Sequence, residues 1–299
     1  MAEVGGSSGG DGDTAVAALR ERIRELEGLL AQASRTGSSK EGNRNSGSEL
    51  EEAAGGGELE LDELPAVAAP GMQRWRLQLA YDGTDFFGWQ RQAGYGSGNG
   101  RTIQGEVEEC LSRVFRAEVR TVGASRTDRG VHARGQVCHF DAPERWGPEL
   151  SSCLDPGTAL RRLRRELPDA ILAMALEKAE PHFHARLSAV RKHYSFRLAT
   201  VDAVSPFEAR YCWCTGPLDL EAMAEAAMSL DRKALDYSTF SMGTPEPDYH
   251  GEVEKTVGLA VREDGPDRAL VVVSCDRFLY RMVRRIVGAL AEAGRGRLR

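Results

Sequence analysis

The residues best suited to chemistry in this chain form the run Ser125-Arg126-Thr127-Asp128-Arg129-Gly130-Val131-His132-Ala133. The run places one carboxylate, Asp128, between two arginines. Neighbouring guanidinium groups favour the ionised form of a carboxylate, and an ionised, positioned aspartate can act as a nucleophile. Asp and Gly are also common in turns for local reasons. On spacing alone, a plain turn with a solvated charge patch is therefore the commoner interpretation.

The flanking segments predict how Asp128 is presented. Residues 119–122 are typical of the end of a strand, and residues 135–140 are typical of a second strand. Asp128 is therefore expected on the turn that joins them. Because turns carry side chains to a surface or a cleft, its carboxylate should be accessible to a substrate.

Five blocks, in one order, resemble the pseudouridine synthases of the TruA type and their eukaryotic relatives. The family signature, close to Arg-Thr-Asp-x-Gly-Val-His-Ala, is matched from Arg126 to Ala133. The other blocks are Tyr81–Gln90, Thr102–Glu106, Phe183–Arg186 with Arg191–Tyr194, and Phe278–Gly288. Ser125 and Arg129 depart from the family pattern, and we expect them to alter RNA contacts. The resemblance covers residues from about 75 to 299.

The order of predicted strands and helices indicates an α+β fold of two ferredoxin-like units. The resemblance implies that both units share a mostly antiparallel sheet with a central active-site cleft. We expect three regions: a tail over 1–72, an N-terminal catalytic subdomain over 73–178 that carries Asp128, and a C-terminal subdomain over 179–299. Family members continue through another helix and a closing strand, so the last subdomain is expected to be incomplete.

The tail contains a short amphipathic pattern within low-complexity sequence. Over about 14–34, Leu19, Ile23, Leu26 and Leu30 recur at alternating spacings of four and three, which predicts a short helix or coiled coil. A dimerising helix and a marginal helix on a tail are both compatible with this pattern. The Gly/Ser-rich stretches on either side are typical of flexible chain. With the resemblance, the pattern suggests a homodimer.

The charge distribution is compatible with an RNA partner, although the whole chain carries a net charge of −6. Residues 1–72 hold 14 acidic and 6 basic side chains, a net of −8, which leaves +2 for residues 73–299. Arginines cluster over 161–165 and again over 277–299. They indicate either phosphate contacts or solvated helix faces. No apolar run approaches the ~18 residues that a membrane span requires.

Neither the cysteines nor the histidines form a pattern typical of a metal site. The six cysteines are scattered and include no Cys-x-x-Cys pair, which predicts reduced thiols. We treat His132 and His184 as structural. Since converting uridine to pseudouridine involves no redox change and no external group, the resemblance implies that no cofactor is needed.

The resemblance also implies roles for particular residues. Asp128 corresponds to the catalytic aspartate, Tyr194 to a tyrosine that stacks on the target base and could abstract a proton, and Arg284 to the arginine that pairs with the catalytic carboxylate. The predicted RNA-binding residues are Arg126, which would help extrude the base, together with Arg129, Arg186, Arg281 and Arg285. Taken alone, Tyr194 could be an ordinary strand aromatic and Arg284 a solvated helix residue.

These observations predict a tRNA pseudouridine synthase acting on uridines of the anticodon stem-loop, at tRNA positions 38–40, after the base is flipped out. An alternative is a catalytically impaired RNA-binding protein of the same fold. A glycosidase is disfavoured because such enzymes commonly use two carboxylates, and an interaction scaffold leaves the later motifs unexplained. The acidic tail favours the cytoplasm or nucleus, and an organelle stays open.

Overall fold

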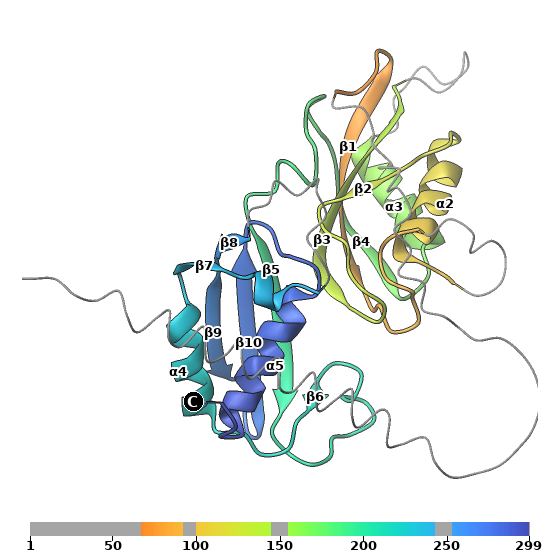
Figure 1. Cartoon of the computed structure of the whole chain (residues 1–299). Coiled ribbons are helices and arrows are strands. Elements are labelled where there is room, and N and C mark those ends of the chain that lie inside the picture. Colours follow the sequence, from red (N-terminus) through yellow and green to blue (C-terminus); the bar gives the residue numbers. More distant parts are fainter. Residues whose placement is uncertain (1–66, 92–99, 145–154, 243–252, 299) are drawn as a thin grey trace, which may run out of the picture. The chain divides into compact units, whose positions relative to one another are not determined.

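The computed structural model describes residues 67–91, 100–144, 155–242 and 253–298. The predicted helix or coiled coil over 14–34 lies outside the described residues. The described residues form two compact units, divided between Ala189 and Val190 (Figure 1). Within these ranges, no helix is both long enough and apolar enough to cross a membrane.

The first unit is a four-stranded antiparallel sheet with two helices. Its elements, in chain order, are β1 (Met72–Tyr81), α2 (Ile103–Phe115), β2 (Val122–Gly123), β3 (Ala133–Pro143), α3 (Pro156–Glu166) and β4 (Ile171–Lys178). The strands lie in the order β2-β3-β1-β4, with every neighbouring pair antiparallel. This order places β1 at the centre, between β3 and β4.

The two helices cover one face of this sheet (Figure 1). Alternate residues of β1, namely Trp75, Leu77, Leu79 and Tyr81, are almost fully buried and pack in one core with α2 and α3. This is the alternation that a half-buried strand requires. The opposite face carries polar or charged side chains of β1, such as Arg76 and Gln78. The core therefore fixes which side chains of β1 face outward.

Capping side chains fix where the helices of the first unit begin. The hydroxyl of Thr102 accepts a hydrogen bond from the backbone N–H of Gly105, at 3.2 Å. Asp155 caps α3 in the same way, through the backbone N–H of Thr158 at 2.9 Å. Such side chains satisfy N–H groups that have no partner within the helix. Thr102 before a run to about Phe115 predicts a helix that starts there, and the structure confirms this start.

The second unit is built from two sheets and two main helices. Its elements are β5 (Lys192–Ala199), β6 (Trp213–Cys214), α4 (Leu220–Leu230), β7 (Ala234–Asp236), the short 3₁₀ helix η1 (Ser238–Phe240), β8 (Glu254–Thr256), β9 (Gly258–Glu263), β10 (Arg268–Cys275) and α5 (Met282–Gly294). The larger sheet has the order β6-β5-β10-β9, and β7 pairs with β8. Only the β5–β6 pairing is parallel among the described strand pairs.

A separate hydrophobic core holds this unit together. It joins α4 and α5 to β9 and β10, with Met223, Val271, Val273, Ile286 and Leu290 among its buried members. The sequence predicts one strand over 256–262, whereas the structure has two strands there, β8 and β9, separated at Val257. Val257 is fully buried and its carbonyl accepts a hydrogen bond from Arg232. Its carbonyl is thereby directed to Arg232.

At the level of fold class, the structure confirms a fold that combines helices with mostly antiparallel sheets. The hydrogen-bonded strand pairs lie within each unit. The ferredoxin-like topology of each unit and the sharing of a single sheet by both units stay predictions.

Candidate active site

Asp128 lies where the sequence predicts it, on the loop between β2 and β3. We call residues 124–132 the Asp128 loop. Its N-terminal end is tied to β3: the backbone N–H of Ala124 donates to the carbonyl of Val137 at 2.8 Å, and the Gln136 amide donates to the carbonyl of Ser125 at 2.6 Å. Asp128 itself is exposed. The loop therefore presents its carboxylate at the surface of the first unit.

A second loop holds the Asp128 loop from the side. It follows β1 and spans residues 82–89, and we call it the clamp loop. The backbone N–H of Trp89 donates to the carbonyl of Thr127 at 2.9 Å, and that of Gly130 donates to the carbonyl of Phe86 at 3.3 Å. These two bonds flank Asp128 in sequence, so they fix the backbone on both sides of the carboxylate.

Two glycines of the clamp loop permit this close approach. A Cβ atom at Gly88 would lie 2.5 Å from the carbonyl oxygen of Thr127, and one at Gly83 would lie 2.0 Å from that of Val131. Gly88 also has a φ of +93°, which L side chains rarely adopt. Only glycine therefore allows the two loops to pack backbone against backbone at these points.

A hydrogen bond from the core supports the same point of the Asp128 loop. Tyr81, at the end of β1, is almost fully buried, and its hydroxyl lies 2.9 Å from the Thr127 hydroxyl. Thr127 directly precedes Asp128. The core of the first unit thus contacts the residue next to the candidate nucleophile through a side-chain hydrogen bond.

Asp82 and His132 close the other end of the two loops. Oδ1 of Asp82 lies 3.0 Å from Nδ1 of His132 and accepts hydrogen bonds from the backbone N–H and hydroxyl of Thr84. Nδ1 of His132 also lies 3.2 Å from the backbone nitrogen of Gly83. That nitrogen of the imidazole can accept from Gly83 or donate to Asp82, according to its protonation. In either state His132 joins the loops, consistent with the structural role expected for it.

The two arginines beside Asp128 are exposed. The guanidinium carbon of Arg129 lies 4.3 Å from the centre of the Phe87 ring, a cation–π arrangement. Arg129 is therefore oriented by the clamp loop, and Phe87 supplies a contact that the motif alone does not indicate. Arg126, the residue before Thr127, is exposed.

The predicted site residues of the second unit lie on β5 and α5. Tyr194 pairs with Val273 of β10, and its partly exposed ring packs edge-to-face on Phe278, at 5.2 Å between ring centres. Arg284 is exposed in the first turn of α5. Arg281 lies directly before that helix with a φ of 57°, and its guanidinium contacts Tyr280 and Met242.

Arg285 is engaged within the second unit. Its Nη1 donates to the carbonyls of Thr239 and Ser241, both at 2.9 Å. These carbonyls lie in and directly after η1, so Arg285 ties the 3₁₀ helix to α5. The RNA-binding role predicted for it stays a prediction.

Arg186 lies in a segment anchored by a buried charge network. Arg74 forms a two-pronged ion pair with Asp141, at 2.8 and 2.9 Å, and also donates to the carbonyl of Phe183 at 3.0 Å. Nδ1 of His139 accepts from the backbone N–H of Ala185 at 3.1 Å. Burial, with further contributions from His184 and Arg74, lowers the pKa of His139 to about 4. The backbone of residues 183–185, directly before Arg186, is thus held by the neutral imidazole of His139 and by the guanidinium of Arg74, which is paired with Asp141.

Within each unit the structure shows which predicted residues lie near one another. Asp128, Arg126 and Arg129 share one loop of the first unit, whereas Tyr194, Arg281, Arg284 and Arg285 belong to the second. Among the described residues, no cluster of three or more His, Cys, Asp or Glu side chains is arranged to hold a metal ion.

Comparison with known proteins then identifies the family. A family model described as tRNA pseudouridine synthase matches residues 79–189, which include the whole Asp128 loop and the clamp loop. The tRNA pseudouridine synthase A of Corynebacterium glutamicum is 40% identical over 227 residues, covering 75% of this chain and 77% of the relative. The protein of the same name from Methylococcus capsulatus is 38% identical over 225 residues, with the same coverage. This chain belongs to the tRNA pseudouridine synthase A family.

Membership of this family, also known as TruA, makes the chain an isomerase that forms pseudouridine in tRNA. Another family member, from Bacteroides thetaiotaomicron, is 36% identical over 234 residues, which cover 76% of the chain and 79% of the relative. The TruA resemblance expected from the motifs is confirmed.

The sequence interpretation missed the contacts that position the TruA motif. Phe87, Gly88 and Tyr81 all lie within the first block of resemblance, but no role was predicted for them. Glycines on both sides of Phe86-Phe87 were the available signal, since glycine often marks close backbone approach. Their partners could be named only once β1 and β3 were in register.

Proposed function

We propose that this enzyme isomerises uridine to pseudouridine in the anticodon stem-loop of tRNA, at positions 38–40, with Asp128 as the nucleophile. The observation that carries the nucleophile assignment is the exposed carboxylate on a loop held by backbone hydrogen bonds at Thr127, directly before it, and at Gly130, two residues after it. Such preorganisation matters because small misplacements of a reacting group lower the rate strongly.

The reaction needs one covalent catalyst and no external group. The Asp128 carboxylate forms a covalent intermediate with the sugar or the base, and the bond between C1′ and N1 breaks. The base turns, a bond forms between C1′ and C5, and the covalent bond to Asp128 breaks, which restores the carboxylate. The C5 proton leaves and N1 gains a proton, so that the atoms balance without a cofactor. The target uridine must first leave its stack, at a cost of a few kcal/mol.

The remaining site residues take the roles that the family resemblance implies. Arg126 helps extrude the base, Tyr194 stacks on it and could remove the C5 proton, and Arg284 pairs with the Asp128 carboxylate. The position of Arg284 in the first turn of α5 and the partial exposure of Tyr194 are compatible with these roles. Arg129, Arg186, Arg281 and Arg285 are proposed to contact the RNA.

Replacing Asp128 with asparagine tests the proposal. Asp128→Asn keeps the shape but removes the nucleophile, so pseudouridine formation should be abolished. Affinity for tRNA should stay within about three-fold, because phosphate contacts dominate RNA binding. Carbodiimide-stop sequencing of the treated tRNA measures the product and its position. Asp169→Asn, an exposed turn residue of the same unit, is the matched control and should retain full activity.

A catalytically impaired RNA-binding protein is the alternative function, and the same experiment separates the two. If the unaltered chain binds tRNA but forms no pseudouridine, the alternative holds. If Asp128→Asn retains pseudouridine formation, the assignment of Asp128 is wrong.

We also propose a homodimer that acts in the cytoplasm or nucleus. The leucine and isoleucine periodicity of residues 14–34 supports the dimer, and the acidic composition of residues 1–72 supports the location. Light scattering of the purified protein tests the first, and imaging of a tagged chain tests the second.

A further inference from the structure

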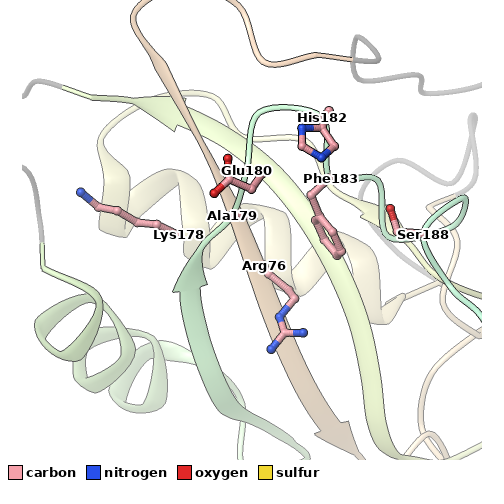
Figure 2. Close-up of a pocket in the computed structure, with 7 residues that line it drawn as sticks. All are labelled: Arg76, Lys178, Ala179, Glu180, His182, Phe183 and Ser188. Carbon is pink, nitrogen blue, oxygen red and sulfur yellow. The ribbon is translucent and has the colours of Figure 1, made fainter.

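A pocket of about 270 Å³ opens on the first unit. It is lined by Arg76, Lys178, Ala179, Glu180, His182, Phe183 and Ser188. Figure 2 shows that these residues come from β1, from the end of β4, and from the connection that follows β4. Sites for drug-sized ligands are typically about 300–1,000 Å³, so this pocket suits a smaller group.

The pocket lies well away from the Asp128 loop. Arg76 precedes Tyr81 by five positions on β1, and Tyr81 contacts Thr127. At about 3.3 Å per residue, the separation along the strand is roughly 17 Å. A nucleotide held in the pocket is therefore a different one from the nucleotide that meets Asp128.

The charges around the pocket favour a polar, uncharged group over a phosphate. Arg76 is paired with Glu177, which is not among the lining residues, at 2.9 Å between Nη2 and Oε2. The lining holds one further cation, Lys178, and one carboxylate, Glu180. When Glu177 is counted with the lining residues, two cations are matched by two carboxylates, which leaves no excess positive charge for a phosphate. The lining does offer both hydrogen-bond donors, on His182 and Ser188, and an acceptor on Glu180.

Phe183 gives the pocket an aromatic wall. Its ring is half-buried and packs edge-to-face against His139, at 6.1 Å between centres. Unpaired RNA bases are recognised by stacking on aromatic side chains, together with hydrogen bonds to their edges. Since base edges carry donors and acceptors side by side, the composition of this pocket matches a nucleobase.

The wall is fixed before any ligand arrives. The carbonyl of Phe183 accepts a hydrogen bond from the buried Arg74, and the carbonyl of Pro181 accepts one from the backbone N–H of Ala68, at 2.9 Å. The backbone N–H of Ala185 donates a hydrogen bond to Nδ1 of His139. Binding to a preorganised surface costs less conformational entropy.

We propose that this pocket binds an unpaired nucleobase of the tRNA, distinct from the isomerised uridine, by stacking on Phe183. The proposal rests on the proposed action at the anticodon stem-loop, which supplies unpaired bases in its loop. It assigns to the first unit a second contact with the substrate, which would set the register of the RNA relative to Asp128.

An abasic scan of the RNA tests the proposal. Anticodon stem-loop hairpins, each lacking one loop base, are titrated against the full chain and against Phe183→Leu. One position other than the isomerised uridine should lose roughly 5- to 100-fold in affinity with the full chain, the range expected for a stacked base. Phe183→Leu should bind the intact hairpin more weakly by a similar factor and show no further loss at that position.

Two further variants keep the test decisive. Glu180→Gln changes an exposed side chain, so it should fold normally and alter the preference among bases at the same loop position. Asp169→Asn changes an exposed residue that precedes β4, at the end of the strand opposite the pocket, and should leave the abasic profile unchanged. Melting temperatures confirm that each variant is folded.

The outcomes separate this proposal from the proposed function. If pseudouridine forms normally but no abasic penalty depends on Phe183, the pocket does not bind a base. If the dependent position is the isomerised uridine itself, Phe183 acts in the catalytic site and the proposal is wrong. If the full chain forms no pseudouridine in any tRNA, the proposed function fails first.

Discussion

At the scale of single residues, the candidate nucleophile is set by neighbours that carry out no chemistry themselves. The Thr127 backbone accepts from Trp89, and its side chain meets Tyr81. Asp128 is therefore held through the residue before it, while its own side chain stays exposed. Mutations beneath the loop should alter turnover even though they never touch RNA.

Tyr81→Phe removes only the hydroxyl that meets Thr127. We expect a stability loss of about 1 kcal/mol and a several-fold fall in turnover, with tRNA affinity unchanged. Tyr237→Phe is the matched control, since that buried tyrosine donates to the Leu230 carbonyl in the other unit and should cost stability alone. Thr127→Val should show the same effects, and the double variant should add little, because both remove one interaction. If the losses of turnover in the two single variants add up in the double variant, the hydrogen bond between Tyr81 and Thr127 does not act on Asp128.

His139 gives the fold a defined dependence on pH. Its lowered pKa of about 4 means that the folded state resists a proton that the unfolded chain accepts near pH 6.5. This contribution makes the protein less stable as the pH falls from about 6.5 towards 4. His139 faces Arg74, Asp141 and His184, so a charged imidazole would lie beside another cation.

We expect His139→Gln to lose less stability than the unaltered chain between pH 7 and pH 4.5. The glutamine amide can still accept from Ala185 but takes up no proton in this range. Thermal melting at a series of pH values measures the difference, and His182→Gln, an exposed histidine nearby, serves as control. Parallel melting curves for all three proteins would contradict the assignment.

At the scale of elements, the site depends on two loops packed backbone to backbone. The clamp loop follows β1 and the Asp128 loop precedes β3, and these two strands are direct neighbours in the sheet. The end of β1 and the start of β3 therefore lie side by side, which places the two loops next to each other. Gly83 and Gly88 allow the loops to come into backbone contact. Loop packing, more than any side chain, sets the position of Asp128.

Gly88→Ala should disrupt that packing. The new Cβ would meet the Thr127 carbonyl oxygen at 2.5 Å, in addition to the strain of a positive φ, so the Asp128 loop must shift. We expect turnover to fall more than about ten-fold, because displacements near 1 Å are costly in catalysis. The measurement is single-turnover pseudouridine formation at saturating enzyme.

Gly265→Ala provides the matched control. Gly265 has a similar φ of +100° but nothing within 4 Å of an added Cβ. Its variant should lose about 1–2 kcal/mol of stability from the backbone conformation and keep full turnover. Equal turnover in the two variants would show that the close contact at Gly88 is unimportant.

At the scale of the whole molecule, two hydrophobic cores and an uneven charge distribution stand out. Each unit buries its own core. Residues 1–72 carry a net charge of −8, whereas residues 73–299 carry +2. An acidic segment should repel RNA at low ionic strength, where charges are poorly screened.

Removing residues 1–66 should leave the melting temperature and the saturated turnover unchanged. The removed residues contain all 14 acidic side chains of the first 72, so tRNA binding at low salt should be equal or tighter. The difference should vanish as salt rises towards about 1 M, where the screening length is near 3 Å. Binding titrations at several salt concentrations test this. A loss of turnover above ten-fold, with folding intact, would show that the segment belongs to the active unit.

The sequence by itself determined the features that depend on neighbours along the chain. The alternation of apolar and polar residues over 75–81 predicts β1, Thr102 predicts a helix start, and the motif order indicated the family that the comparisons then showed. The resemblance named Asp128, and the strand patterns around it predicted its loop. These signals are local, because side-chain alternation and capping involve residues within a few positions of one another.

Only the tertiary structure decided what meets the Asp128 loop. The approach of Gly88 to Thr127 joins residues 39 positions apart, and the bonds from Arg285 to the carbonyls beside η1 span 46 and 44. Such pairs follow from strand register and helix packing, which no single segment encodes. A shift of one residue between β1 and β3 would turn the alternate side chains of β1 to the other face and separate the two loops. The position of the candidate nucleophile thus depends on the register of the sheet, although the nine residues 125–133 are enough to identify it as Asp128.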